Sequence, residues 1–126
     1  RDAGTDPIEA PVLVRHGSFY YLFVSRDYCC KGTDSTYQVA IGRSAAITGP
    51  YVDADGNDMA VGGGTVLLAS RGDRIGPGGQ SYDQGYLAFH YYDGAAGGAP
   101  TLAIRLLSWT DDGWPVLRTS DELATP

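Results

Sequence analysis

The sequence predicts an all-β fold made of two similar units. Eighteen glycines and seven prolines divide the 126 residues into short segments. These segments alternate apolar and polar residues or are rich in aromatic side chains, which is typical of strands. No segment has the apolar spacing of a helix. A partial internal repeat then divides the predicted strands into two sets.

The first unit reads as a hairpin, a third strand and a short outer strand. Residues 12–15 and 19–25 are predicted strands joined by a turn at residues 16–18. Residues 37–44 predict the third strand, and residues 50–52 predict a short fourth.

The second unit partly repeats the first. Four strands in each unit of about 65 residues are typical of propeller blades. We expect one blade at about residues 8–60, a second at about residues 61–117 and a tail at residues 118–126; a chance repeat is the alternative. Tyr20, Phe23 and Asp27 recur 66 residues later as Tyr86, Phe89 and Asp93, and Ser44 and Gly49 recur 64 residues later as Ser108 and Gly113.

Two blades cannot close a propeller, which needs about four to eight of them. Two alone leave an exposed flank and unpaired strand edges. If the repeat is real, we expect this chain to be part of a longer protein or to pair with another chain. The start at Arg1, within loop-like sequence, fits a fragment or a cleavage product.

Composition excludes some classes of partner. The net charge is −6, and the nine Lys and Arg residues form no cluster, so nucleic acid is not expected as a partner. No apolar run reaches the roughly 20 residues of a membrane-spanning helix. Nine tyrosines and two tryptophans offer flat apolar faces with a polar edge, which suit sugar rings. Strand preference for aromatic residues is the simpler explanation.

The pair Cys29-Cys30 does not form the disulfide framework of a small secreted domain. Adjacent Cα atoms lie about 3.8 Å apart, closer than the usual range across a disulfide. Zinc is not expected, since nothing completes a four-ligand set. The pair is either two thiols or a strained bridge between neighbours, and the sequence does not decide.

Two glycine-rich segments and one acidic segment predict turns. Residues 62–64 and 76–79 lack the Gly-Lys-Ser/Thr sequence of a phosphate-binding loop, so we expect turns there, the second at the rim of a site. Residues 53–58 resemble a calcium loop only in part and predict a solvated turn.

Glu9 is the candidate acid. It stands in Ile8-Glu9-Ala10-Pro11, where Ala10 adds no bulk and Pro11 restricts the preceding backbone. Apolar surroundings disfavour the charged form of a carboxylate, which is what a proton-donating catalyst needs. A surface Glu in a strand-entry turn is the simpler explanation of the tetrapeptide alone.

Ten motifs, taken in their order and spacing, favour a catalytic role for Glu9 over a surface position. Together they resemble glycoside hydrolase family 43, and most closely its arabinan-degrading members, over residues 8–117. The motifs are IEAP at 8–11, FYYLFVS at 19–25, YCCKG at 28–32, STY at 35–37, GRS at 42–44, ITGPY at 47–51, IGPGGQ at 75–80, FHYYD at 89–93, PTL at 100–102 and WTDDGWP at 109–115.

The resemblance implies a five-bladed β-propeller that hydrolyses α-1,5-linked arabinan with inversion, of which this chain is the C-terminal part. It implies that Glu9 is the general acid. The family's general base and a further Asp belong to earlier blades, so no Asp here takes either role and the enzyme is incomplete in this chain. Asp2, Asp6 and Asp27 are interpreted as solvated charges.

The resemblance also implies further site residues and partners. Ser35, Tyr37 and Gln80 are candidates for binding the sugar, and His90 for binding a central calcium ion, although calcium prefers oxygen ligands. A buried histidine without a ligand role is the alternative for His90. The expected substrate is arabinan or an arabino-oligosaccharide, the expected partner is the N-terminal blades of the same enzyme, and the expected location is secreted and extracellular.

Two other functions stay open on the sequence. A non-catalytic carbohydrate-binding module would explain the aromatic content and the acidic charge equally well. A purely structural half-propeller, with its tyrosines in the core, is the third interpretation.

Overall fold

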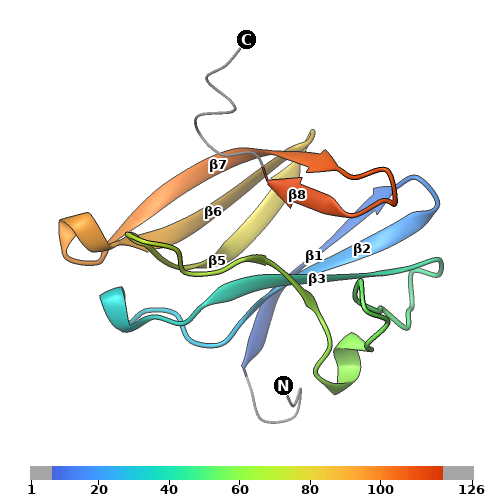
Figure 1. Ribbon diagram of the computed structural model, residues 1–126, viewed down its shortest axis with the longest axis horizontal. Helices are drawn as coiled ribbons and strands as arrows, with labels where there is room; N and C mark the ends of the chain where they lie inside the picture. The colour runs from blue at the N-terminus through green and yellow to red at the C-terminus, as the bar shows by residue number, and fades with distance from the viewer. Residues whose placement is uncertain (1–6, 118–126) are drawn as a thin grey trace.

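The computed structural model describes residues 7–117, which form two four-stranded antiparallel sheets (Figure 1). In each sheet the strands lie in chain order, so that every strand pairs with its sequence neighbour. Short 3-10 turns η1 (Gly32–Asp34), η2 (Met59–Val61) and η3 (Gly94–Ala96) lie in the connections. The first sheet holds β1 (Ile8–His16), β2 (Phe19–Arg26), β3 (Gln38–Ser44) and β4 (Thr65–Leu68), and the second holds β5 (Arg74–Asp83), β6 (Tyr86–Asp93), β7 (Ala99–Trp109) and β8 (Pro115–Leu117).

The predicted hairpin and third strand of the first unit are confirmed, but the predicted fourth strand at residues 50–52 is wrong. Val52 forms only isolated bridges, to Arg43 and to Asp58. Pro50 has no N–H to donate, and the chain turns at Asp53, so pairing cannot continue there. The outer strand is β4 instead.

The position of β4 also moves the expected boundary between the units. The first sheet extends to Leu68 and the second begins at Arg74, so the boundary lies between these residues and not near residue 60. The expected tail at residues 118–126, and Asp2 and Asp6, lie outside the described residues. Within residues 7–117, no helix is long and apolar enough to cross a membrane.

The main core lies between the two sheets. Side chains alternate along β2, and Tyr21 and Phe23 face this core while Leu22 and Val24 face the other side, toward Met59. Burying one such large apolar side chain contributes about 1.5–3 kcal/mol. The buried residues of the main core come from both sheets: Val14, Tyr21, Phe23, Val39, Ile41, Leu87, Phe89, Ala103 and Leu107.

The two sheets are also joined where the β1–β2 hairpin meets the β7–β8 connection. The Arg43 guanidinium lies over the rings of Phe19 and Trp114, at 4.2 Å and 4.5 Å from their centroids. The Tyr21 hydroxyl donates to the Gly113 carbonyl. Elsewhere, β5 contacts β1, β2 and β3, and this second junction contains the candidate site.

Candidate active site

A bulge in β1 determines the face of the sheet to which Glu9 points. Glu9 pairs with Ser25 and Val12 pairs with Phe23, so two residues of β1 lie opposite one residue of β2 between these pairs. In a regular strand, positions 9 and 12 would point to opposite faces, because side chains alternate and the two positions are three residues apart. The bulge restores a common face, and Glu9 therefore lies beside Ser25.

Ala10 carries the backbone distortion of the bulge. Its φ is +53°, in the left-handed region that costs an L-residue about 1–2 kcal/mol. The sequence predicted a restricted backbone before Pro11 but not this conformation. The Ala10 carbonyl accepts a hydrogen bond from Gln80 Nε2 of β5 at 2.7 Å, so the second sheet holds the bulge of the first.

Ser25 links the two sheets at the same place. Its hydroxyl oxygen accepts from the backbone N–H of Gly79 at 2.9 Å and its proton is donated to Gln80 Oε1. Ser25 is fully buried and Gln80 is 4% exposed. The amide of Gln80 is thus bound at both ends within the protein.

Tyr37 is the direct partner of the candidate acid. Its hydroxyl donates to Glu9 Oε1 at 2.9 Å. Burial raises the pKa of the Tyr37 hydroxyl, a hydrogen bond with Ser25 opposes this, and the acceptor Glu9 raises it further. The net pKa lies above the usual value of 10.0, so Tyr37 keeps its proton and remains a donor at neutral pH.

The segment Gly76–Gly79, predicted to be a turn, lies within β5 instead. The pairing of β5 with β6 is irregular between Ile75 and Ser81, so the segment bends while it remains in the strand. A Cβ on Gly78 would lie 2.1 Å from the Tyr37 ring, and one on Gly79 would lie 2.8 Å from His90. The glycines therefore allow β5 to approach the site residues closely.

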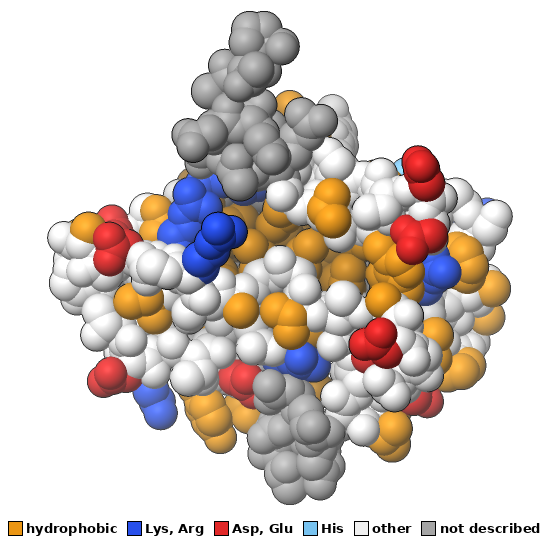
Figure 2. All heavy atoms as spheres, in the orientation of Figure 1, with side chains coloured by type: hydrophobic (Ala, Val, Ile, Leu, Met, Phe, Trp, Pro, Cys, Tyr) orange, Lys and Arg blue, Asp and Glu red, His pale blue; other side chains and the backbone are white. Residues whose placement is uncertain are grey.

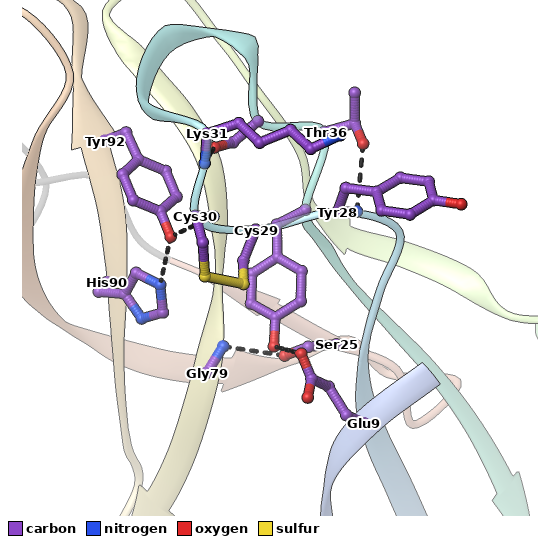
Figure 3. The surroundings of a disulfide bond; sticks show 12 residues. Glu9, Ser25, Tyr28, Cys29, Cys30, Lys31, Thr36, Gly79, His90 and Tyr92 are labelled. Carbon is purple, nitrogen blue, oxygen red and sulfur yellow. Dashed lines mark hydrogen bonds between the residues drawn. A yellow bond between two sulfur atoms is a disulfide. The ribbon is translucent and has the colours of Figure 1, made fainter. Parts of the chain in front are cut away.

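The disulfide between Cys29 and Cys30 is formed, which decides the alternative that the sequence left open. Figure 3 shows it between Glu9 and Ser25 on one side and His90 and Tyr92 on the other. The Cys30 backbone N–H donates to the Tyr92 hydroxyl at 2.8 Å. The loop that carries the disulfide is thereby held to the second sheet.

The five predicted site residues lie at this one junction of the two sheets. His90, on β6, has its ring centroid 6.0 Å from that of Tyr37 and 5.5 Å from that of Tyr92. Ser35 is buried, and its hydroxyl accepts from the Lys31 backbone N–H at 3.0 Å. The binding roles predicted for Ser35, Tyr37 and Gln80 stay predictions.

Calcium at His90 also stays a prediction. Among residues 7–117 no group of three or more His, Cys, Asp or Glu side chains is arranged to hold a metal ion. His90 lies beside the rings of Tyr37 and Tyr92, and the Tyr92 hydroxyl is 3.4 Å from its Nε2, so its surroundings lack the carboxylate and carbonyl oxygens that calcium prefers. The residues described around His90 therefore do not form a calcium site by themselves.

The apolar surroundings expected for Glu9 are not found in the described part of the chain. Glu9 is exposed, and its neighbours are the hydroxyl of Tyr37 and the cross-strand residue Ser25. A cleft of about 1130 Å³ does not include Glu9 in its lining, which contains Leu68, Phe89 and Trp114. Hydrophobic side chains lie across the middle of the face shown in Figure 2.

Sequence reasoning missed two residues of the site, Ser25 and Ala10. The signal for Ser25 was a polar residue in the alternating series Tyr21, Phe23, Ser25, where a third apolar residue would be expected. Ala10 gave no such signal, because a left-handed alanine depends on the hydrogen bond from Gln80, 70 residues away.

The model of the glycosyl hydrolases family 43 matches residues 1–115 of the chain. This chain belongs to glycosyl hydrolase family 43. An extracellular endo-alpha-(1->5)-L-arabinanase of Bacillus subtilis is 48% identical to this family 43 chain over 109 residues, which are 86% of the chain and 33% of that protein. An extracellular exo-alpha-(1->5)-L-arabinofuranosidase of Cellvibrio japonicus is 43% identical over 117 residues, 90% of the chain and 34% of that protein.

Solved structures of arabinanases match the fold. An exo-1,5-alpha-L-arabinanase from a bovine ruminal metagenomic library has a TM-score of 0.85 and 49% identity, over 89% of this chain and 38% of that one. An alpha-L-arabinanase of Cellvibrio cellulosa, complexed with arabinohexaose, has a TM-score of 0.84 and 42% identity, over 92% of this chain and 38% of that one. The two sheets are thus two blades of the predicted five-bladed propeller, and the chain spans about a third of the length of its curated relatives.

Proposed function

We propose that this chain forms the acid-bearing part of an inverting hydrolase of α-1,5-linked L-arabinan, with Glu9 as the general acid. The substrate is arabinan or an arabino-oligosaccharide, and the remaining blades of the propeller supply the general base. The enzyme is secreted, as the extracellular names of two relatives suggest.

The proposed reaction needs two carboxyl groups on opposite sides of the sugar. Glu9 donates its proton to the glycosidic oxygen as the bond from that oxygen to the anomeric carbon breaks. A water molecule forms the new bond from the opposite face and loses a proton to the base. The two carboxyl groups must stand about 6.5–9.5 Å apart to admit this water, which favours residues on different blades.

The observation that carries the proposal is the bulge at Ala10. It brings Glu9 to the face of Ser25, where the hydroxyl of Tyr37 contacts the carboxylate. A surface glutamate with no role would not need a left-handed alanine beside it. Backbone strain of this kind is found preferentially at functional sites.

Removal of the acid in the complete protein tests the proposal. We expect Glu9→Gln to lower kcat on arabinan by a factor of about 10²–10⁴, the usual contribution of a positioned proton donor. Arabinosides with an activated phenolate leaving group need less protonation and should retain more activity. Circular dichroism and thermal unfolding should match the parent protein.

The anomer formed first, followed by proton NMR on a fresh digest, tests inversion independently. A product with the same anomeric configuration as the substrate would contradict the two-carboxylate geometry given above. If the parent protein binds arabino-oligosaccharide but releases no product, the non-catalytic carbohydrate-binding module is the correct function instead.

A further inference from the structure

Gln80 was expected from the sequence to bind the sugar, but its amide is engaged within the protein. It is 4% exposed, its Nε2 donates to the Ala10 carbonyl at 2.7 Å, and its Oε1 accepts from Ser25. A side chain whose amide is bound at both ends is poorly placed to exchange hydrogen bonds with a sugar.

We propose that Gln80 is a positioning residue that locks the bulge at Ala10 and so fixes the direction in which Glu9 points. The inference rests on the proposed function, because it gives Gln80 a role only through the acid. Gln80 acts across the junction of the two sheets, from β5 to β1, and touches neither the substrate nor the reacting atoms.

A chain of hydrogen bonds holds Gln80 in place. The Gly79 N–H donates to Ser25, and Ser25 donates to Gln80. Ser25 is also the cross-strand partner of Glu9. The residue that orients Gln80 thus lies directly opposite the acid.

The bulge decides to which face of the sheet Glu9 points. Side chains alternate along a strand, so if the bulge were replaced by regular strand geometry, Glu9 would turn to the other face of the sheet. The left-handed φ of Ala10 disfavours the bulged form, and the hydrogen bond from Gln80 to the Ala10 carbonyl favours it. Gln80 therefore biases β1 toward the form in which Glu9 faces the site.

The role has a kinetic signature that a sugar-binding role lacks. Misplacement of the acid slows proton transfer to the leaving group but leaves the sugar contacts intact, so kcat falls while KM stays constant. The loss should also depend on the leaving group, because an activated phenolate departs with little protonation. A residue that binds the sugar would instead raise KM for all substrates.

The experiment compares Gln80→Met with the parent in the complete protein. Methionine keeps the length of the side chain and removes the amide. On arabino-oligosaccharide we expect kcat to fall about 10- to 100-fold with KM within about twofold, and on a nitrophenyl arabinofuranoside we expect kcat to fall less than about threefold.

Gln38→Met is the matched control. The amide oxygen of Gln38 also accepts a hydrogen bond, from Arg26 Nε at 2.7 Å. We expect Gln38→Met to keep the parent's ratio of kcat on arabino-oligosaccharide to kcat on the nitrophenyl arabinofuranoside. If Gln80→Met does not fold, Ser25→Ala removes the partner that orients Gln80 and should show the same dependence on the leaving group.

Equal losses on both substrates, or a raised KM without a change in kcat, would overturn the positioning role. The double variant Glu9→Gln with Gln80→Met should be no slower on arabino-oligosaccharide than Glu9→Gln alone, because the acid is already gone. If Glu9→Gln itself shows no dependence on the leaving group, the proposed function fails and the role of Gln80 fails with it. If Glu9→Gln shows the dependence on the leaving group but Gln80→Met does not, the positioning role of Gln80 is wrong while the proposed function stands.

Discussion

Asp53 shows what one buried carboxylate does for the long loop between β3 and β4. It is 7% exposed and accepts hydrogen bonds from the backbone N–H groups of Asp55, Asn57 and Gly64. Burial acts to raise the pKa of Asp53, but these backbone donors more than offset it, and the pKa lies below its usual 3.8. The predicted solvated turn is therefore wrong for Asp53, because the loop folds around its carboxylate.

We expect Asp53→Asn to lower the free energy of unfolding by about 1–3 kcal/mol at pH 7, the scale of hydrogen bonds to a charged group. A lowered native pKa stabilises the fold fully above the unfolded value, near pH 4, and this contribution is lost as the pH falls through the native pKa. The difference between parent and variant should thus shrink below about pH 4.

Urea unfolding of the complete protein at pH 7 and pH 3 measures this. The control is Asp55→Asn, at an exposed residue of the same loop, which should change stability by less than about 0.5 kcal/mol. Equal effects of the two variants at pH 7 would contradict the role given to Asp53.

Single residues of the site were predictable where their type was unusual for the position. Glu9 and His90 are polar residues whose neighbours in the sequence are apolar or aromatic, and both lie at the junction of the sheets. The role of Gln80 was not predictable, because its partners Ala10 and Ser25 lie 70 and 55 residues away in the sequence.

At the scale of the element, β5 is the strand that brings the two sheets together at the site. Its glycines remove the side chains that would collide with the first sheet: Tyr37 occupies the space of a Cβ on Gly78, and Ser35 lies 2.6 Å from that of Gly76. This explains why a strand interior accepts residues that have low strand preference.

We expect Gly78→Ala to displace Tyr37 and to lower the free energy of unfolding by about 1–3 kcal/mol, as overpacked sites do. Because Tyr37 donates to Glu9, activity on arabinan should fall as well. The control is Gly72→Ala, where a Cβ meets nothing within 4 Å and only the positive φ of +58° is unfavourable. Thermal unfolding and kcat of both variants check this, and wild-type activity of Gly78→Ala would show that Tyr37 need not hold its position.

The elements themselves were predictable where local pattern decides them. The aromatic-rich apolar residues 19–25 predict β2, and they are apolar on both faces because each face of this strand packs in a core cluster. The outer strand β4 was missed because residues 45–64 separate it from β3, whereas β8 follows β7 after a short connection. The turn predicted at 76–79 failed because glycine serves close approach there and not a change of direction.

At the scale of the whole molecule, the second sheet has an apolar face that the described residues do not cover. Leu102 is 72% exposed and Ile104 is 52% exposed, and both lie on the face of β7 away from the main core. Soluble proteins rarely expose adjacent large apolar side chains without a partner for them. The proposed remaining blades would pack on this face, as propeller blades do around their axis.

The substitution Ile104→Lys tests whether another blade covers the apolar face of β7. In the complete protein we expect it to lower the free energy of unfolding by more than about 2 kcal/mol, because a charge is then buried against the next blade. In the 126-residue chain alone, the same change should reduce self-association in sedimentation velocity, because it interrupts an exposed apolar surface.

The control is Ile47→Lys, at a loop residue of similar exposure, 56%, which should change the stability of the complete protein by less than about 0.5 kcal/mol. Equal stability of the two variants in the complete protein would show that no further blade covers β7.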